Sequence, residues 1–355
     1  MGGDIGLASS SGVWVQYMNT RYLVKRALYA LATIYVAVSL TFFLIRLLPG
    51  GPKTYIKNKL MKSQTSMSVE EINNLAAAYT NVYPDQPLHM QYLSYMTSAV
   101  QGDFGTSVWF GEPVSQVIWR AMPWTLFLST TTLFLGLMIG IVVGGLMAYN
   151  EGGRFDIGMT TYTLISGSIP YYMLAILLIY VFGFIWGIFP TSGAYASGVE
   201  PGFNLPFMMS VAYHATLPIT SMVLVAFGGT ALGLRSNAIS ELGADYIRAA
   251  RIRALPQHRI ALRYVARNAI LPMYTGIMMG IASVFGGSII LEQIFGYQGV
   301  GYIMFKATMS RDYPLMMGSF ILVTVATVVG IFIADVTYGM VDPRIEAGGE
   351  GRESY

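Results

Sequence analysis

The sequence predicts an all-α integral membrane protein with six transmembrane helices, and three observations lead to that prediction. Of the 355 residues, 54% are hydrophobic and only 11% are charged, whereas charged residues make up about 25% of an ordinary soluble domain. The mean hydropathy is +0.54, and the 39 glycines exceed the usual share in soluble proteins. Six segments are also apolar over roughly the 20 residues needed to cross a bilayer. A soluble globular protein is therefore excluded.

The six predicted spans are separated by charged or turn-forming residues. They cover residues 27–45, 125–148, 158–186, 217–234, 269–291 and 315–334. The first is longer than the apolar stretch of a signal peptide, and no Ala-x-Ala cleavage pattern follows it, so we expect a retained helix. The third carries Pro170 inside it. A proline within a span is tolerated where neighbouring helices or a water-filled cavity satisfy the freed carbonyls, so Pro170 is a candidate for a pathway through the spans.

The distribution of the 21 Lys and Arg residues predicts the orientation in the membrane. With a cytoplasmic N-terminus, thirteen of them lie inside and eight outside, and six of those eight fall within residues 46–124. That segment is longer than the loops over which the positive-inside rule is counted. Residues 1–26 and 346–355 are therefore predicted to be cytoplasmic ends of a membrane domain that covers residues 27–345. Residues 46–124 should form a folded outer cap with a helix-like stretch near residues 69–75, and residues 235–267 should form a cytoplasmic region.

Signatures of enzymatic chemistry are missing from the sequence. The chain has no cysteine, and its three histidines, His89, His214 and His258, are scattered, so no metal-ligand spacing and no thiolate nucleophile are indicated. No Gly-Lys dipeptide occurs, which excludes a Walker A phosphate loop. The net charge of +3 is too small to indicate a nucleic-acid partner. We therefore expect a non-catalytic protein that itself binds no metal and no cofactor.

Ionisable groups are nearly absent from the predicted spans. Arg46 and Glu292 mark outer ends of spans, and Asp335 marks an inner end. Ion-coupled carriers usually keep such groups near midspan. We expect these three residues and Pro170 to border a pathway that is lined by Tyr, Met, Ser, Thr and Gly. The driving force should then come from outside the chain.

The cytoplasmic region begins with an amphipathic helical pattern from Glu241 to Leu255. One stripe of this predicted helix is apolar: Leu242, Tyr246, Ile247 and Ala250. Acidic residues come early and arginines late, as the helix dipole favours. Pro256 should end the helix, and Arg259, Arg263 and Arg267 then follow at four-residue spacing. The alternative is a helix that only rests on the lipid surface.

The same region resembles the Glu-Ala-Ala loop of ABC importer permeases. Arg248-Ala249-Ala250 stands in the Glu-Ala-Ala position, Ala254 in the position of a glycine, and Leu271-Pro272 closes the pattern. The run from Asp245 to Arg251 most resembles the dipeptide/oligopeptide/nickel permease family. The resemblance implies that a coupling helix here contacts an ATPase through Glu241, Gly243, Ala244, Asp245, Tyr246, Arg248, Ala249, Ala250, Arg251, Ala254 and Leu255.

Further short motifs follow the order of that family along most of the chain. They are Arg46-Leu47-Leu48-Pro49-Gly50, Asp85-Gln86-Pro87-Leu88, Gly102-Asp103-Phe104-Gly105 with Ser107, Pro113-Val114, Ser168-Ile169-Pro170, Glu292-x-Ile294-Phe295, Arg311-Asp312-Tyr313-Pro314 and Asp342-Pro343-Arg344. The chain departs from the family pattern at Gly51, where an aspartate is usual, at Ala254, and at Gln298-Gly299-Val300-Gly301, where Pro-Gly-Leu-Gly is usual. These departures indicate a divergent member.

The resemblance implies a multi-pass permease subunit of the plasma membrane. Its expected partners are a second, homologous permease, two ATP-binding subunits that hold the ATP and Mg²⁺, an extracellular substrate-binding protein and the lipid membrane. The expected cargo is a small oligomer, in the first place a dipeptide or oligopeptide, with oligosaccharides as the alternative. Bare nickel fits least, because scattered histidines offer no ligand set. From the residues alone, two functions of another class remain possible alternatives: an ATP-independent channel or carrier, and a membrane anchor without a transport role.

Overall fold

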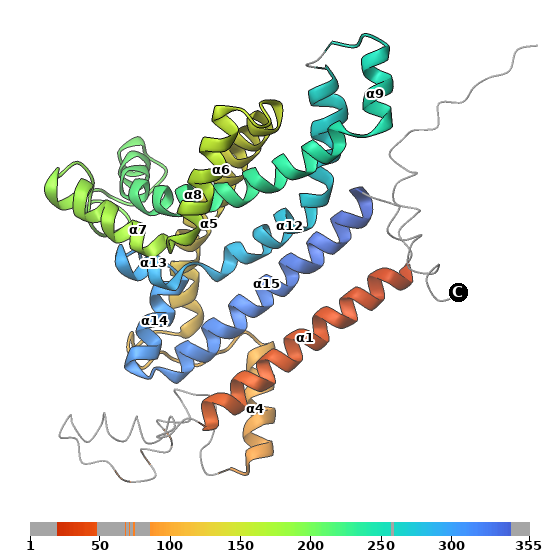
Figure 1. The fold of residues 1–355 in the computed structure, drawn as a ribbon. Helices are drawn as coiled ribbons and strands as arrows, with labels where there is room; N and C mark the ends of the chain where they lie inside the picture. Colours follow the sequence, from red (N-terminus) through yellow and green to blue (C-terminus); the bar gives the residue numbers. More distant parts are fainter. Residues whose placement is uncertain are drawn as a thin grey trace, which may run out of the picture.

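The computed structural model describes residues 20–47, 68, 71, 74, 86–256 and 259–341 of the chain (Figure 1). Within these residues the chain forms helices and no β-strand, apart from an isolated bridge between Thr106 and Pro113. The predicted all-α membrane fold is confirmed. Residues 1–19, most of residues 48–85 in the predicted outer cap, and the C-terminal residues 342–355, with the Asp342-Pro343-Arg344 motif, lie outside the described part.

Among the described residues, five helical segments are long and apolar enough to cross a membrane, and a bent pair of helices qualifies as a sixth. Four of the five are single helices: α1 (Thr20–Leu47), α5 (Val114–Tyr149), α8 (Leu205–Leu242) and α15 (Tyr313–Val341). The fifth combines α12 (Tyr274–Ser283), the turn η5 (Val284–Gly286) and α13 (Ile289–Ile294). The bent pair consists of α6 (Arg154–Ser168) and α7 (Tyr171–Leu178), which continues as the π-helix η2 (Ile179–Ile185). The shorter elements are α4 (Leu88–Val100), α9 (Asp245–Ile252), η3 (Ile260–Ala266), α11 (Arg267–Ile270), η4 (Leu271–Met273) and α14 (Val300–Ser310).

The third predicted span is not a continuous helix. Helices α6 and α7 meet at Ile169 and Pro170 with a bend of 93°. Ile169 has an extended backbone, with φ −97° and ψ 121°, because the ring of a following proline disfavours the helical conformation. Pro170 therefore precedes α7 at a break, and the segment predicted as the third span, residues 158–186, is a bent pair of helices.

The fifth predicted span is interrupted as well. After η5 the chain turns at Gly287, whose φ of 61° and ψ of −169° belong to a region that essentially only glycine occupies. The Ser288 hydroxyl then accepts a hydrogen bond from the Leu291 backbone N–H at 3.3 Å and caps α13. The segment predicted as the fifth span, residues 269–291, therefore overlaps the candidate span Gly276–Ile294, which is built from several short helices.

Helices α5 and α8 pack closely because glycines face the contact. Gly136, Gly140 and Gly144 recur every fourth residue of α5, and all three are buried. A methyl group on Gly140 would lie 2.6 Å from the Thr230 Cβ, and one on Gly144 would lie 2.5 Å from the Ala231 carbonyl oxygen. Small residues at this spacing let two backbones approach, which is how helices gain packing energy in lipid. At Gly140 and Gly144 the two helices thus approach more closely than ordinary side chains would allow.

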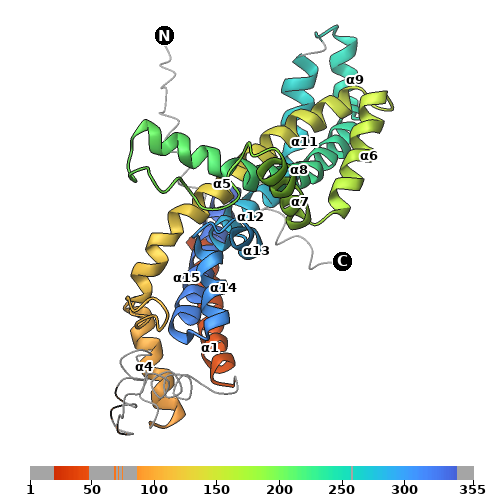
Figure 2. The ribbon, with the colours of Figure 1, turned by 90° about the vertical axis from the view of Figure 1, so that its left-hand side faces the viewer.

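The ends of the bundle can be followed in Figures 1 and 2, where α9 lies at the top and α4 at the bottom. Helices α1 and α15 pair near the start of one and the end of the other, through an ion pair of 3.0 Å between Arg26 and Asp335. The two outermost described segments of the chain therefore begin and end on the same side of the bundle. In the outer cap, the Ser68 N–H donates to Glu71 at 2.7 Å and the Glu71 N–H donates to the Ser68 hydroxyl at 3.2 Å, a reciprocal pattern that starts helices.

Candidate functional site

The predicted coupling helix is divided into a helix end, a turn and a shorter helix. Glu241 belongs to the last turn of α8, which ends at Leu242. Gly243 and Ala244 form the turn, and the extended backbone of Ala244 precedes α9. The prediction of one helix from Glu241 to Leu255 is therefore wrong, because α9 covers only Asp245–Ile252. The predicted coupling residues nonetheless lie in α9 or within a few residues of it in the chain, and α9 is at the top of Figure 1.

The apolar stripe of α9 is covered by the chain itself. Ile247 and Ala250 are 0% and 4% exposed, and they pack with Ile260, Val265 and Ala269 from the segment that follows. Ile247 and Ala250 are therefore not accessible to a partner subunit, whereas Tyr246 of the same stripe is 40% exposed. Burial of Ile247 and Ala250 anchors α9 to the end of α8 and to the base of the fifth span.

Tyr246 adds a polar link to the same anchor. Its hydroxyl donates to the Glu241 carboxylate of α8 and accepts a hydrogen bond of 2.8 Å from the Asn268 amide of α11. Partial burial and the hydrogen bond to Glu241 raise the pKa of the Tyr246 phenol, so the hydroxyl keeps its proton at neutral pH and remains a donor. Tyr246 thus ties three segments together with its ring still 40% exposed.

The opposite face of α9 is open. Asp245, Arg248, Ala249 and Arg251 are exposed, and the side chain of Ile252 is 81% exposed. The Arg248 guanidinium lies 4.0 Å from the Asp245 carboxylate, with both side chains in solvent, so the pair contributes little to stability. This face, of Asp245, Arg248, Ala249 and Ile252, offers one apolar side chain among charges, as a polar protein interface does.

Ala254 ends the turn in a left-handed conformation. Its φ is 52°, and its N–H donates to the Arg251 carbonyl at 2.9 Å. L-residues other than glycine, asparagine and aspartate rarely take this conformation, because Cβ comes too close to the backbone. The glycine usual at this position of the Glu-Ala-Ala pattern therefore has a steric reason, and this chain departs from the pattern where the backbone most favours glycine. Leu255 follows and is partly buried against the same cluster.

An ion pair fixes α6 to α8 near the turn. The Arg235 Nε and Nη2 lie 2.5 Å and 2.7 Å from the two carboxylate oxygens of Asp156, a two-point geometry that is among the stronger ion pairs. The Asp156 side chain is 3% exposed, and it also accepts a hydrogen bond of 2.9 Å from the Gly152 N–H. The sequence places Arg235 on the cytoplasmic side but gives no sign of this partner.

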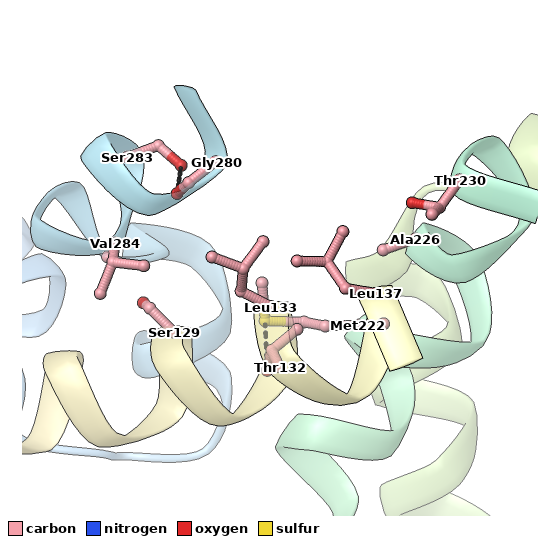
Figure 3. Close-up of a pocket in the computed structure, with 12 residues that line it drawn as sticks. Ser129, Thr132, Leu133, Leu137, Met222, Ala226, Thr230, Gly280, Ser283 and Val284 are labelled. Atoms are coloured by element: carbon pink, nitrogen blue, oxygen red, sulfur yellow. Dashed lines mark hydrogen bonds between the residues drawn. The ribbon is translucent and has the colours of Figure 1, made fainter. Parts of the chain in front are cut away.

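A cavity opens between α5, α8 and α12 (Figure 3). Its volume is about 230 Å³. The lining residues are Ser129, Thr132, Leu133, Gly136, Leu137, Met222, Ala226, Thr230, Gly280, Ser283, Val284 and Gly287. Charged side chains and tyrosine are absent from this lining, while Ser, Thr, Met and Gly are present. Sequence reasoning does not identify these residues, although the glycine spacing in α5 marks the helix face beside them.

The four residues predicted to border the pathway do not come together at this cavity. Arg46 lies in the last turn of α1, and Pro170 is at the break before α7. Asp335 pairs with Arg26 between α1 and α15. Glu292 is 1% exposed and does not stand at an open mouth. That these residues border a pathway through the spans stays a prediction.

Glu292 instead lies in a closed hydrogen-bonded network next to the cavity. Its carboxylate accepts from the Thr125 hydroxyl of α5 at 2.9 Å and from the Tyr302 N–H of α14 at 3.0 Å. The Val300 N–H in turn donates to the Thr125 oxygen at 2.7 Å. Tyr297, nearby, is fully buried, and its burial raises the pKa of its phenol.

Two of the short sequence motifs meet where Asp312 contacts the segment between α4 and α5. The Asp312 carboxylate accepts hydrogen bonds from the Ser107 hydroxyl at 2.6 Å and from the Trp109 N–H at 2.8 Å. Its other oxygen accepts from the Leu315 N–H at 3.2 Å, at the start of α15. Asp312 is fully buried, so it joins the outer cap to the last membrane helix.

Comparison with known proteins gives a consistent set of relatives. Residues 140–347 match the family model described as the binding-protein-dependent transport system inner membrane component. The oligopeptide transport system permease protein AppB of Bacillus subtilis is 33% identical over 327 residues, which are 92% of this chain and 99% of that protein. The dipeptide transport system permease protein DppB of the same organism is 30% identical over 93% of this chain and 99% of its own length. The oligopeptide transport system permease protein OppB of Haemophilus influenzae is 28% identical over 92% and 99%.

Among solved structures, an inward-facing conformation of the MetNI methionine ABC transporter has a similar fold. The TM-score is 0.51 at 18% sequence identity, over 64% of this chain and 97% of that chain. This similarity concerns the helical arrangement and carries no statement about cargo.

Proposed function

Because this chain belongs to the family of binding-protein-dependent transport system inner membrane components, we propose that it is the permease subunit of an importer for dipeptides and oligopeptides. The observation that supports peptides best is the uncharged cavity between α5, α8 and α12. A wall of small, hydroxylated and apolar groups has no charged group with which to reject one peptide side chain in favour of another. The relatives named as oligopeptide and dipeptide permeases are also similar from end to end.

The subunit acts in this proposal with four kinds of partner. A second, homologous permease supplies the other half of the translocation pathway, and an extracellular substrate-binding protein delivers the peptide. Two ATP-binding subunits hold ATP and Mg²⁺ and perform the hydrolysis, since this sequence has no Walker A motif of its own. The chain thus contributes a path and a lever and is not itself catalytic.

The turn between α8 and α9 is the proposed lever. ATP-driven closure of the ATP-binding subunits pushes on the open face of α9, formed by Asp245, Arg248, Ala249 and Ile252. The buried Ile247 and the Tyr246 hydrogen bonds pass that displacement to α8 and α11. Because α8 runs from the turn to the cavity wall at Met222 and Thr230, its tilt changes the cavity. A bistable arrangement of this kind is what alternating access requires.

The proposed orientation places both termini and α9 in the cytoplasm and α4 outside. The charge distribution supports it, as do the paired ends of α1 and α15. The absence of native cysteine gives a clean background for a test, with Ser240→Cys at the end of α8 and Gln101→Cys after α4, both exposed positions. An impermeant maleimide should label Gln101→Cys from outside intact cells and Ser240→Cys only after lysis. Labelling of both from the same side contradicts the orientation.

The cargo is tested by competition in proteoliposomes that contain the complete importer. We expect ATP-dependent uptake of a labelled tripeptide to be reduced by unlabelled peptides of differing side chains, and to be unaffected by a trisaccharide. Competition by the trisaccharide alone would favour the oligosaccharide alternative and contradict the proposal.

A further inference from the structure

Glu292 connects three segments that are distant in sequence. Its residue lies in α13, and its carboxylate accepts from Thr125 of α5 and from the backbone of Tyr302 in α14. Thr125 completes the network by accepting from the Val300 N–H at 2.7 Å. Both Glu292 and Thr125 are buried, at 1% and 0% exposed. An ionisable residue among membrane helices is costly and is a functional candidate by default.

The backbone around this carboxylate leaves no space for ordinary side chains. A methyl group on Gly299 would lie 2.4 Å from a Glu292 carboxylate oxygen and 2.4 Å from the Thr125 hydroxyl. One on Gly301 would lie 2.9 Å from the Ile289 backbone, and one on Gly287 would lie 2.7 Å from Glu292 Oε1. Glycines at three positions therefore let the backbone close over one carboxylate, which is the geometry of a fixed clamp.

Opening this clamp would cost free energy. Separation of α14 from α5 would break the hydrogen bond from Val300 to Thr125 and one of the two bonds that Glu292 accepts, from Thr125 or from Tyr302, and buried polar groups that lose a partner are destabilising. Helices α13, α14 and α5 should therefore move together whenever the cavity changes shape.

The other side of the cavity is formed by α12, which packs against the second half of α15, whereas the first half of α15 packs against α5 and α14. Helix α12 contacts α15 closely, because a methyl group on Gly330 would lie 3.0 Å from the Ala282 Cα. The chain passes from α12 to α13 at Gly287, in a conformation essentially reserved for glycine. Ser288, the next residue, already belongs to the clamped side, because its hydroxyl caps α13 by accepting from the Leu291 N–H at 3.3 Å. Gly287 itself lines the cavity.

We propose that Glu292 is a positioning residue that clamps α5, α13 and α14 into one rigid body, and that α12 swings against this body at Gly287 to open and close the cavity. The inference rests on the proposed function for its transport cycle. Failure of the clamp proposal can be distinguished from failure of the proposed function. The clamp is tested by a distance within the permease, and that distance does not depend on which cargo is carried.

The first test measures motion with pairs of spin labels in the complete importer, using the absence of native cysteine. One pair, Gln116→Cys on α5 and Met309→Cys on α14, lies within the proposed rigid body. The other, Phe134→Cys on α5 and Met279→Cys on α12, crosses the hinge. All four positions are exposed. Between the nucleotide-free and the ATP-trapped states, the first distance should stay constant and the second should shift by several ångströms. A shift in the first pair, or none in the second, overturns the proposal.

The second test asks whether the clamp depends on the Glu292 network, in the permease labelled at Gln116→Cys and Met309→Cys. Thr125→Val removes the hydroxyl at nearly constant volume and should broaden the distance distribution, as should Glu292→Gln. Thr125→Ser keeps the hydroxyl and should restore the narrow distribution. Gln293→Leu, at the neighbouring position, is the matched control and should leave the distance distribution narrow. Equal broadening in Thr125→Ser and Thr125→Val, or none in Glu292→Gln, contradicts the assignment.

Discussion

Ala254 is strained in a way that a single substitution can relieve. Its φ of 52° costs an L-residue about 1–2 kcal/mol, and the greater chain entropy of glycine offsets about half of that. We therefore expect Ala254→Gly to stabilise the protein by about 0.5–1 kcal/mol, measured as a higher midpoint of thermal unfolding in detergent. Ala249→Gly, in the middle of α9, is the control and should lose about 1 kcal/mol. Loss of stability in Ala254→Gly would show that the left-handed conformation is not present.

Asp156 and Arg235 supply the second prediction at the scale of single residues. Asp156→Asn removes the charged partner of the Arg235 guanidinium, whose side chain is 27% exposed, from a site where the Asp156 side chain is 3% exposed, so we expect a loss of about 2–3 kcal/mol in the free energy of unfolding. The control is Glu112→Gln, since the pair of Glu112 with Arg120 has a similar distance of 2.8 Å but exposed side chains. It should cost less than about 1 kcal/mol. Equal costs in the two variants would contradict the burial of the Asp156 pair.

At the scale of helices, the seam between α5 and α8 gives a matched pair of variants. A methyl group on Gly144 would lie 2.5 Å from the Ala231 carbonyl oxygen, whereas one on Gly145 meets nothing within 4 Å. Gly144→Ala should force the helices apart and cost about 1–3 kcal/mol. Gly145→Ala should be neutral or stabilising by up to about 1 kcal/mol, because alanine favours the helix. Thermal unfolding of the two variants distinguishes a close helix contact from ordinary packing, and identical midpoints would exclude the close contact.

The open face of α9 gives the prediction that concerns coupling. Ile252 is 81% exposed and Ile247 is 0% exposed. We expect Ile252→Asp to fold and insert with normal stability, and to reduce peptide-stimulated ATPase activity at least several-fold, because its effect falls on a partner. Ile247→Asp is the contrasting variant and should reduce the amount of folded permease, since it buries a charge in the chain's own core. Full ATPase stimulation in Ile252→Asp would return α9 to the alternative of a lipid-surface helix.

The sequence predicts some of these elements well and others poorly, for identifiable reasons. Long apolar runs predict that helices cross the membrane, because composition alone decides that question. The break at Pro170 can be predicted from the sequence, since a residue before proline avoids the helical conformation. The angle of 93° between the two helices depends on tertiary packing and cannot be predicted in this way. The apolar stripe with Ile247 shows the limit most clearly. Periodicity identifies an apolar face without saying whether the same chain or a partner covers it.

Buried polar contacts were the least predictable part of the site. Glu292 stands out in the sequence as a rare carboxylate, yet its partners are Thr125 and the backbone of Tyr302, which no local pattern connects to it. The cavity is similar, since its lining comes from α5, α8 and α12, far apart in the chain. The lack of charge in the spans predicts which types of residue line the cavity, but it does not predict at which positions they lie.

On the scale of the whole molecule, the fold presents apolar helices to the outside and buries polar contacts such as the Glu292 network within the bundle. Helix α1 exposes many large apolar side chains, among them Leu28, Leu31 and Leu40, as a helix that faces lipid or another membrane subunit must. One chain of this kind provides one wall of a pathway and one lever. Under the proposed function, transport therefore requires partner subunits that hydrolyse ATP. This requirement distinguishes the permease from a channel or carrier that acts alone.

The most direct measurement of that dependence is uptake of a labelled tripeptide into proteoliposomes, with and without the ATP-binding subunits and ATP. We predict accumulation above the external concentration only when permeases, ATP-binding subunits, binding protein and ATP are all present, and no flux when ATP is replaced by a non-hydrolysable analogue. Equilibration of the peptide through the permeases alone, unaffected by ATP, would contradict the account and identify a passive channel or carrier.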